Sequence, residues 1–311
     1  MTLQQLQYIV ALDNHRHFVR AADSCFVAQP TLTLQVKKLE SQINLVIFDR
    51  SSQPLKPTPM GELFIAKARQ ILRDIEQLKH LVNSNRNEVS GTFRLGIIPS
   101  LSQYLLPLFM PEFSQAFPET VLEVKEWQSD AIIEGIQKDL LDIGILATPL
   151  EEPSLREVPI FYEPFLIFAN EHDPILSHKS ISPSDLEQEE LWLLEKGHCF
   201  RNQSLNICAK KSNGNGKLRN IQLEGGSLET LKRMVSKTSG YTLIPELSYN
   251  KHTDQHLTRR FREPQPVREV SLVMHKSFTK ELLINELRKS IMANTPKSFR
   301  KNTKFHTVKW R

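Results

Sequence analysis

The first sixty residues carry apolar positions at the spacing of short helices. Apolar residues recur at helical intervals from Leu3 to Val10 and predict an opening amphipathic helix. A second short helix is predicted over 18–23. After a tight break at 24–28, a third helix is predicted to begin at Pro30, because proline suits the first helical position.

The third helix separates an apolar face from a polar one. Its apolar stripe runs from Leu32 to Ile43, and the opposite face offers hydroxyl, amide and ammonium groups. The segments 46–50 and 54–57 predict a short hairpin, which would be the wing of a winged helix-turn-helix. Such a helix can read base edges in the major groove, while basic residues on the wing meet phosphates. A three-helix packing module with solvated charges is the alternative. The candidate DNA-binding residues are Gln29, Pro30, Thr31, Thr33, Gln35, Lys37, Lys38, Arg50 and Lys56.

A long helix with a heptad pattern is predicted next. Thr58 can cap it, and Pro59 occupies its first turn. Apolar residues then step by 4, 3, 4, 3 and 4, which is a coiled-coil seam made of Phe64, Ala68, Ile71, Ile75, Leu78 and Val82. The seam predicts pairing with a second copy and a roughly palindromic DNA site, unless the stripe packs on its own domain. The polar run 83–87 predicts a hinge.

Strands and helices alternate from Thr92 onward, which predicts an α/β domain with parallel strands. Ser100 and Ser129 follow the first two strands, where their simplest role is to cap the next helix. The predicted elements are a strand at 93–98, a helix at 102–116, a strand at 121–124, a helix at 131–138 and a strand at 143–146.

Charge is distributed unevenly along the 311 residues. The net charge of +5 divides into +3 for residues 1–88, −4 for 89–296 and +6 for the tail 297–311. Basic ends around an acidic middle predict a polyanion as partner of the ends. We expect the tail to be mobile. No leader and no 18-residue apolar run are visible, so a cytoplasmic protein with no membrane partner is expected.

Two of the three cysteines, Cys199 and Cys208, lie nine residues apart. Cys199 is flanked by His198 and Arg201, whose positive charge favours a thiolate. A helix predicted over 202–209 would hold the two cysteines about 13 Å apart, whereas a disulfide tolerates Cα separations of about 4.4–6.8 Å. Oxidation would therefore require this segment to unwind. The alternative is that both cysteines are buried apolar residues without a redox role.

The third cysteine, Cys25, lies in apolar helical surroundings and is interpreted as a core residue. An odd number of cysteines argues against a secreted disulfide scaffold.

Two sets of short motifs connect the chain to a known family. The first set is Arg16-His17-Phe18, Ala21-Ala22-Asp23-Ser24, Gln29-Pro30-Thr31-Leu32, Lys38-Leu39-Glu40 and Phe48-Asp49-Arg50. It resembles the LysR-type transcriptional regulators. The second set is Gly197-His198-Cys199, Arg201, Gln203, Cys208, Ser227-Leu228-Glu229-Thr230-Leu231 and Gly240-Tyr241-Thr242-Leu243-Ile244-Pro245. It resembles the OxyR-type hydrogen peroxide sensors, and the resemblance covers about residues 2–292.

The resemblance implies an α+β multidomain protein with a long dimerisation helix and a two-lobed α/β domain like that of periplasmic binding proteins. The implied domains are a winged helix-turn-helix at 1–58, a dimerisation helix and hinge at 59–90, a regulatory domain at 91–296 and a basic tail at 297–311. Lobe I is expected at 92–162 plus 268–296, and lobe II at 163–267.

The resemblance also implies a peroxide pocket. Its members would be Ser100, Ser129, His198 and Arg268. OxyR-type proteins carry threonine at the positions of both serines, so this chain keeps the hydroxyls and lacks two methyl groups. On the residues alone, His198 could be a structural histidine and Arg268 a salt-bridged arginine.

The function implied by the resemblance is transcriptional regulation switched by peroxide. Cys199 would be the peroxidatic cysteine and Cys208 the resolving one, with a Cys199–Cys208 disulfide controlling an activator of oxidative-stress genes. Expected partners are palindromic double-stranded DNA, hydrogen peroxide, RNA polymerase and further copies of the chain in a homodimer or homotetramer. No cofactor and no metal are expected. A LysR-type regulator of a small metabolite with structural cysteines is the alternative, and a thiol enzyme is disfavoured.

Overall fold

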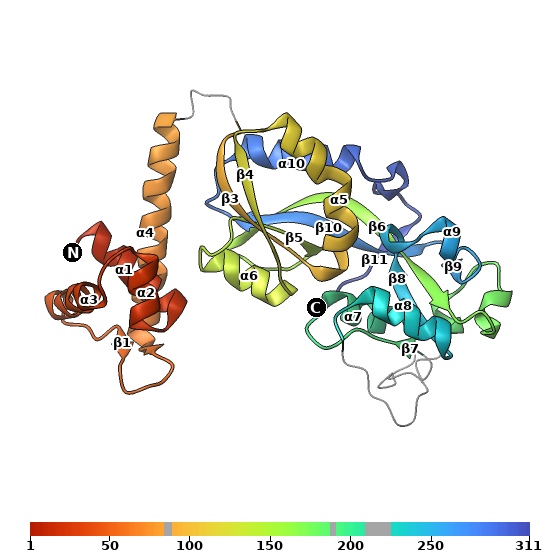
Figure 1. Ribbon diagram of the computed structural model, residues 1–311, viewed down its shortest axis with the longest axis horizontal. Helices are drawn as coiled ribbons and strands as arrows, with labels where there is room; N and C mark the ends of the chain where they lie inside the picture. Colours follow the sequence, from red (N-terminus) through yellow and green to blue (C-terminus); the bar gives the residue numbers. More distant parts are fainter. Residues whose placement is uncertain (84–88, 187–190, 209–224) are drawn as a thin grey trace. The chain divides into compact units, whose positions relative to one another are not determined.

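The computed structural model describes residues 1–83, 89–186, 191–208 and 225–311. The chain divides into two compact units, one built from residues 1–87 and the other from nearly all of residues 88–311. Figure 1 shows the elements of each unit. None of the helices in the described ranges has the length and apolar character needed to cross a membrane.

The N-terminal unit is a winged helix-turn-helix around one hydrophobic core. Its elements are α1 (Leu3–His15), α2 (Phe18–Ser24), α3 (Gln29–Ile43), β1 (Phe48–Asp49), β2 (Lys56–Pro57) and α4 (Pro59–Asn83). The Thr2 side chain accepts a hydrogen bond from the Gln5 amide and starts α1. Leu12, Leu32 and Phe48 are fully buried between the elements. The predicted three helices and antiparallel hairpin are confirmed, although each strand is only two residues long.

The fourth helix, α4, is continuous and capped as predicted, because Thr58 Oγ1 accepts a hydrogen bond from the Gly61 amide at 2.9 Å. Its apolar seam is unevenly covered. Ala68 is buried, but Ile71 is 39% and Leu78 62% exposed. The self-pairing of this helix stays a prediction. Among the residues named for the seam and hinge, the Val82 side chain and 84–87 lie outside the described part of the structure.

Nine strands in the described part of the C-terminal unit form one mixed sheet. The order is β4-β3-β5-β10-β6-β8-β7, with β11 beside β10 and β9 beside β6. The strands are β3 (Gly91–Ile97), β4 (Thr120–Glu126), β5 (Ile143–Thr148), β6 (Leu155–Ala169), β7 (Leu191–Trp192), β8 (Tyr241–Pro245), β9 (Thr258–Arg260), β10 (Gln265–His275) and β11 (Phe305–Thr307). Parallel pairing is confirmed for β3 with β4 and β5. The sheet also contains antiparallel pairs, because β10 runs antiparallel to β5 and β6.

The two long strands β6 and β10 belong to both lobes of this unit. They pair antiparallel from Val267 opposite Pro164 to His275 opposite Leu155, and Arg268 lies opposite Glu163 in the register. The first lobe carries α5 (Pro99–Ala116), α6 (Ser129–Gln137) and α10 (Glu281–Ala293). The second carries η1 (Pro174–Ser177), η2 (Pro183–Asp185), α7 (Cys199–Ile207), α8 (Leu228–Lys237), η4 (Glu246–Ser248) and α9 (Lys251–Asp254).

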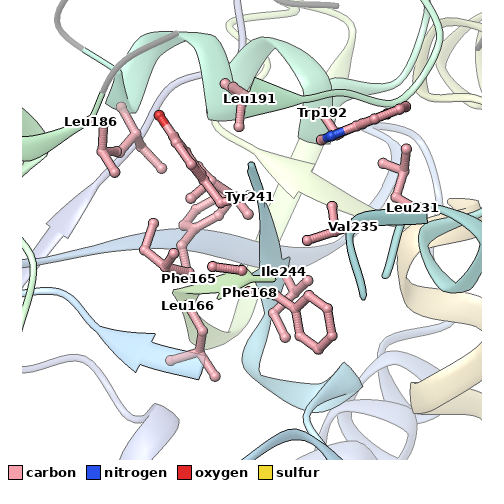
Figure 2. Close-up of a cluster of buried hydrophobic side chains, with 14 of the residues drawn as sticks. Phe165, Leu166, Phe168, Leu186, Leu191, Trp192, Leu231, Val235, Tyr241 and Ile244 are labelled. Atoms are coloured by element: carbon pink, nitrogen blue, oxygen red, sulfur yellow. The ribbon is translucent and has the colours of Figure 1, made fainter. Parts of the chain in front are cut away.

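The core of the second lobe is a cluster of aliphatic and aromatic side chains. Figure 2 shows Phe165 and Phe168 of β6 with Tyr241 and Ile244 of β8 and Val235 of α8. Burial of such side chains contributes about 1.5–3 kcal/mol each to folding. The cluster also contains Phe200, Ile207 and Cys208, so α7 is packed on this core.

Two sequence expectations about helix starts are wrong. Ser100 does not cap α5, because that helix begins at Pro99 with Ile98 in the capping position. Ser129 does not cap α6 either, since it is already the first helical residue and Gln128 precedes it as the cap. Both serines lie in the first turn of a helix and are buried, at 5% and 1% exposure.

The expectation of a mobile basic tail is also wrong. Residues 297–299 form the short helix η5, and β11 pairs parallel with β10. Phe299, Val308 and Trp310 are buried. Three apolar side chains therefore hold the tail against the C-terminal unit, despite its six basic residues.

Candidate functional site

The exposed face of α3 is a candidate nucleic-acid interface. Five of the predicted DNA-binding residues are exposed on this helix, namely Gln29, Pro30, Thr31, Lys37 and Lys38. Leu34 lies between them on the same face and is 65% exposed. Leu34 was not among the predicted residues, although a leucine outside the apolar stripe of Leu32, Val36 and Leu39 indicates an exposed contact. An exposed aliphatic group can contact the methyl group of thymine in the major groove.

Two of the side chains predicted to contact DNA bases are only partly exposed. Gln35 is half-buried, and its Oε1 accepts a hydrogen bond from Gln5 Nε2 at 3.2 Å. Thr33 is half-buried, and its hydroxyl oxygen is covered and makes no hydrogen bond to the described residues. These two positions lie at the margin of the exposed face.

The wing presents one paired and one exposed cation. Arg50 Nη2 bonds Glu40 Oε2 at 2.7 Å, and its guanidinium lies 5.7 Å from the centre of the Phe18 ring. Glu40 Oε1 also accepts from the Ile47 amide at 2.8 Å, which joins the wing to α3. Lys56 is exposed. Phosphate contacts of the wing would therefore involve Lys56 directly and Arg50 after exchange with Glu40.

The candidate redox site lies at the first turn of α7. Cys199 is the first residue of this helix and is only 2% exposed, and His198 precedes it as the capping residue. The sequence had placed the start of the helix at Asn202, three residues too late. The position matters because backbone N–H groups at a helix N-terminus stabilise a thiolate.

The electrostatics at Cys199 differ from the expected thiolate-favouring balance. Burial raises the pKa of the Cys199 thiol, while the Ser129 side chain, the charge of Arg268 and the backbone amides of the first turn lower it. Burial prevails, so the net shift is upward. The Ser129 oxygen makes no hydrogen bond of ordinary geometry within the described structure.

The cation that acts on Cys199 is Arg268, which is fully buried. It forms a salt bridge with Glu163 at 2.7 Å and lies 5.3 Å from the centre of the Phe200 ring. Its Nη1 donates to Ser100 Oγ at 2.7 Å, and its Nη2 donates to the Ser100 carbonyl oxygen at 3.1 Å. Two implied pocket residues are thus joined directly.

The flanking arginine predicted to activate Cys199 has another role. Arg201 Nη1 donates to the carbonyl oxygen of Leu194 at 2.7 Å and so ties the first turn of α7 to the preceding loop. It is not among the charges that lower the pKa of the Cys199 thiol. Glu163 was not among the predicted residues either, although a carboxylate inside an apolar strand indicates a buried ion pair.

His198 lies in a confined position next to Cys199. It is 6% exposed, and its Nε2 is 3.5 Å from Glu195 Oε1. Gly197 has φ +97° and closely approaches Gln128, because a Cβ at this residue would lie 2.5 Å from Gln128 Oε1. The loop before α7 therefore needs glycine to bring His198 and Cys199 against α6.

Cys208 caps the other end of α7. It is 4% exposed, and burial raises the pKa of its thiol to about 12. Both Cys199 and Cys208 are thiols in this structure, with an intact helix between them. At about 1.5 Å per residue the helix keeps their Cα atoms about 13 Å apart. A disulfide between them would require α7 to unwind.

Known proteins match the chain over nearly its whole length. Residues 3–62 match the bacterial regulatory helix-turn-helix protein, lysR family, and residues 86–294 match the LysR substrate binding domain. A hydrogen peroxide-inducible genes activator of Haemophilus influenzae is 35% identical over 88% of this chain and 90% of that protein. The DNA-binding transcriptional dual regulator OxyR of Escherichia coli K12 is 34% identical over 97% of this chain and 98% of its own.

The structural comparison agrees with the sequence comparison. A full-length OxyR variant from Pseudomonas aeruginosa has a TM-score of 0.79 and 31% identity, and the match covers 95% of this chain and 99% of that one. The two matched domain models together account for the DNA-reading head and the two-lobed unit. The chain therefore belongs to the LysR family of bacterial helix-turn-helix transcriptional regulators, which are not enzymes.

Proposed function

We propose that this chain is a transcriptional regulator that binds DNA and senses hydrogen peroxide through Cys199. The observation that carries the proposal is the placement of Cys199 and Cys208 at opposite ends of one helix, with Arg268 and Ser129 acting on the first sulfur. The similarity to peroxide-inducible gene activators supports the same signal.

The first chemical step is attack on the peroxide. The Cys199 thiolate displaces one peroxide oxygen, the O–O bond breaks, and hydroxide leaves. Cys199 becomes a sulfenic acid. Ser100 Oγ already accepts a hydrogen bond from Arg268, so its own proton can be donated to the peroxide. The Ser129 hydroxyl lies beside the Cys199 sulfur, and His198 directly precedes Cys199 in the chain. Both groups can orient the leaving oxygen.

The second step joins the two ends of α7. The Cys208 thiol attacks the sulfenic sulfur, water leaves, and a Cys199–Cys208 disulfide forms. Because a disulfide cannot span the intact helix, α7 unwinds, and Phe200 and Ile207 must leave their places in the core of the second lobe. This change would control the DNA-binding head of a homodimer or homotetramer and activate oxidative-stress genes through RNA polymerase.

A metabolite-responsive regulator with structural cysteines is the second candidate. An open cavity of about 750 Å³ lies along α8 and α9 and is lined in part by Lys232, Arg233 and Asn250. Its buried cation is already satisfied, since Lys232 Nζ bonds Asp254 Oδ2 at 2.8 Å and the Ser248 carbonyl oxygen at 3.0 Å. The cavity is therefore weaker support for a metabolite-responsive regulator than the arrangement of the two cysteines is for a peroxide sensor.

Thiol titration separates the two candidates. Micromolar peroxide should remove two thiols from the wild-type protein and none from Cys199→Ser, while Cys208→Ser should lose one thiol and react with a sulfenic-acid probe. Cys25→Ser is the matched control and should still lose two. A peroxide-treated wild-type protein that keeps all three thiols would favour the metabolite.

A further inference from the structure

The end of the chain lies directly on the redox helix. Three amide side chains of α7 donate hydrogen bonds to three consecutive carbonyl oxygens of the tail. Gln203 Nε2 bonds the Val308 oxygen at 2.8 Å, Asn206 Nδ2 bonds Lys309 at 2.9 Å, and Asn202 Nδ2 bonds Trp310 at 3.1 Å. Gln203 is fully buried in this contact.

The same tail segment is anchored to the first lobe. Val308 donates its amide to the Val267 carbonyl oxygen at 2.9 Å, and Trp310 Nε1 donates to Ala147 at 3.0 Å. Lys309 pairs with Glu151, and Arg311 pairs with Glu152 and with Asp130, the neighbour of Ser129. The tail therefore connects α7 to β5, β10 and the start of α6.

These contacts depend on α7 being helical. Positions 202, 203 and 206 face the tail together only at helical spacing, because residues three and four apart share one face of a helix. Unwinding of α7 would separate the three amides from their carbonyl partners. The tail thus stabilises the form of the molecule in which Cys199 and Cys208 are held apart.

We propose that residues 308–311 are a latch that sets the redox potential of the Cys199–Cys208 pair. The latch rests on the proposed disulfide and concerns its regulation. It stabilises the dithiol form by holding α7 helical, so it makes the pair harder to oxidise. Its hydrogen bonds reach α7 at positions 202, 203 and 206 and not at Cys199, and its nearest link to the cysteine is the ion pair of Arg311 with Asp130.

The test compares the full-length protein with a chain that ends after Thr307. Each is equilibrated with glutathione, in which two protein thiols and one oxidised glutathione give one protein disulfide and two reduced glutathiones. Loss of three hydrogen bonds should raise the equilibrium constant for disulfide formation by about 10- to 100-fold. This corresponds to a potential about 30–60 mV more negative.

A point variant guards against a truncated chain that does not fold. Gln203→Leu removes one donor at similar volume, and Gln203 Oε1 makes no hydrogen bond in the described structure that would be lost. Leucine is a better helix former than glutamine, so helix propensity alone predicts a smaller equilibrium constant for disulfide formation. The latch predicts the opposite, an equilibrium constant that is several-fold larger. Lys304→Ala, which removes a tail ion pair with Glu263 away from α7, is the control and should change nothing.

A kinetic measurement separates the latch from general loosening. In a Cys208→Ser background, Gln203→Leu should leave the rate of sulfenic acid formation unchanged, because it removes a latch contact and keeps the Arg311–Asp130 ion pair beside Ser129. Equal potentials for full-length protein, truncated protein and Gln203→Leu would overturn the latch and leave the proposed function standing. Failure of the full-length protein to form any disulfide would overturn both.

Discussion

At the scale of single residues, the site combines a buried sulfur with a buried cation. Arg268 forms a salt bridge with Glu163 and donates a hydrogen bond to Ser100. Its guanidinium also lies over the ring of Phe200. Arg268 and Ser129 lower the pKa of the Cys199 thiol, but burial prevails and raises it above the ordinary value. In the proposed sensor, the reactivity of this buried sulfur therefore depends on Arg268 and Ser129.

The first prediction concerns pH. Because the pKa of Cys199 is raised, the thiolate is the minor form at neutral pH and its population grows as pH increases. In Cys208→Ser, the rate constant for sulfenic acid formation should rise about tenfold per pH unit below the pKa, as measured by stopped-flow at pH 6–9. Ser129→Ala should shift the profile to higher pH. A flat profile would contradict this account of the site.

The second prediction concerns the DNA-reading face. Leu34→Ala should weaken binding to the operator by about 1 kcal/mol and hardly change binding to random DNA, because an apolar contact to a thymine methyl group discriminates between bases. Lys38→Ala should weaken both equally and reduce the salt dependence by about one phosphate. Titrations at several salt concentrations distinguish the two. If Leu34→Ala lost the same affinity for both DNAs, the Leu34 side chain would not contact the bases.

At the scale of elements, the apolar pattern predicted helices and strands better than their ends. The three N-terminal helices followed from periodicity, because each buries one apolar face. The start of α7 could not be predicted from the pattern. Asn202 is a typical capping residue, whereas His198 caps the helix without a side-chain hydrogen bond. The docked tail was not predictable from its composition, because its partners Ala147 and Gln203 are distant in sequence.

The third prediction concerns α4. Leu78 lies on the heptad seam and is 62% exposed, whereas Leu63 lies off the seam and is 63% exposed. If α4 pairs with a second copy, Leu78→Asp should convert the protein to a monomer at micromolar concentration, because a charge at a core position of a coiled coil is desolvated. Leu63→Asp should leave the mass measured by light scattering unchanged. Identical masses for both variants would place the contact elsewhere.

At the scale of the whole molecule, two units divide the work of the protein. The N-terminal unit presents α3 and the wing, and the C-terminal unit holds Cys199, Cys208 and the docked tail. The resemblance to a known family implied a pocket made of Ser100, Ser129, His198 and Arg268. In the structure, Arg268 donates a hydrogen bond to Ser100, and Ser129 lies beside Cys199. Glu163 and the tail contacts required the fold, because strand pairing and chain termini bring them together.

In the proposed mechanism, oxidation unwinds α7. Hydrogen exchange of the peptide spanning 199–208, measured by mass spectrometry before and after peroxide, reports this unwinding. Wild-type protein should lose protection in this peptide on oxidation, while Cys208→Ser should keep it despite carrying a sulfenic acid. A protein in which Cys199 and Cys208 are disulfide-linked, yet the amides of α7 exchange as slowly as in the dithiol form, would contradict the account.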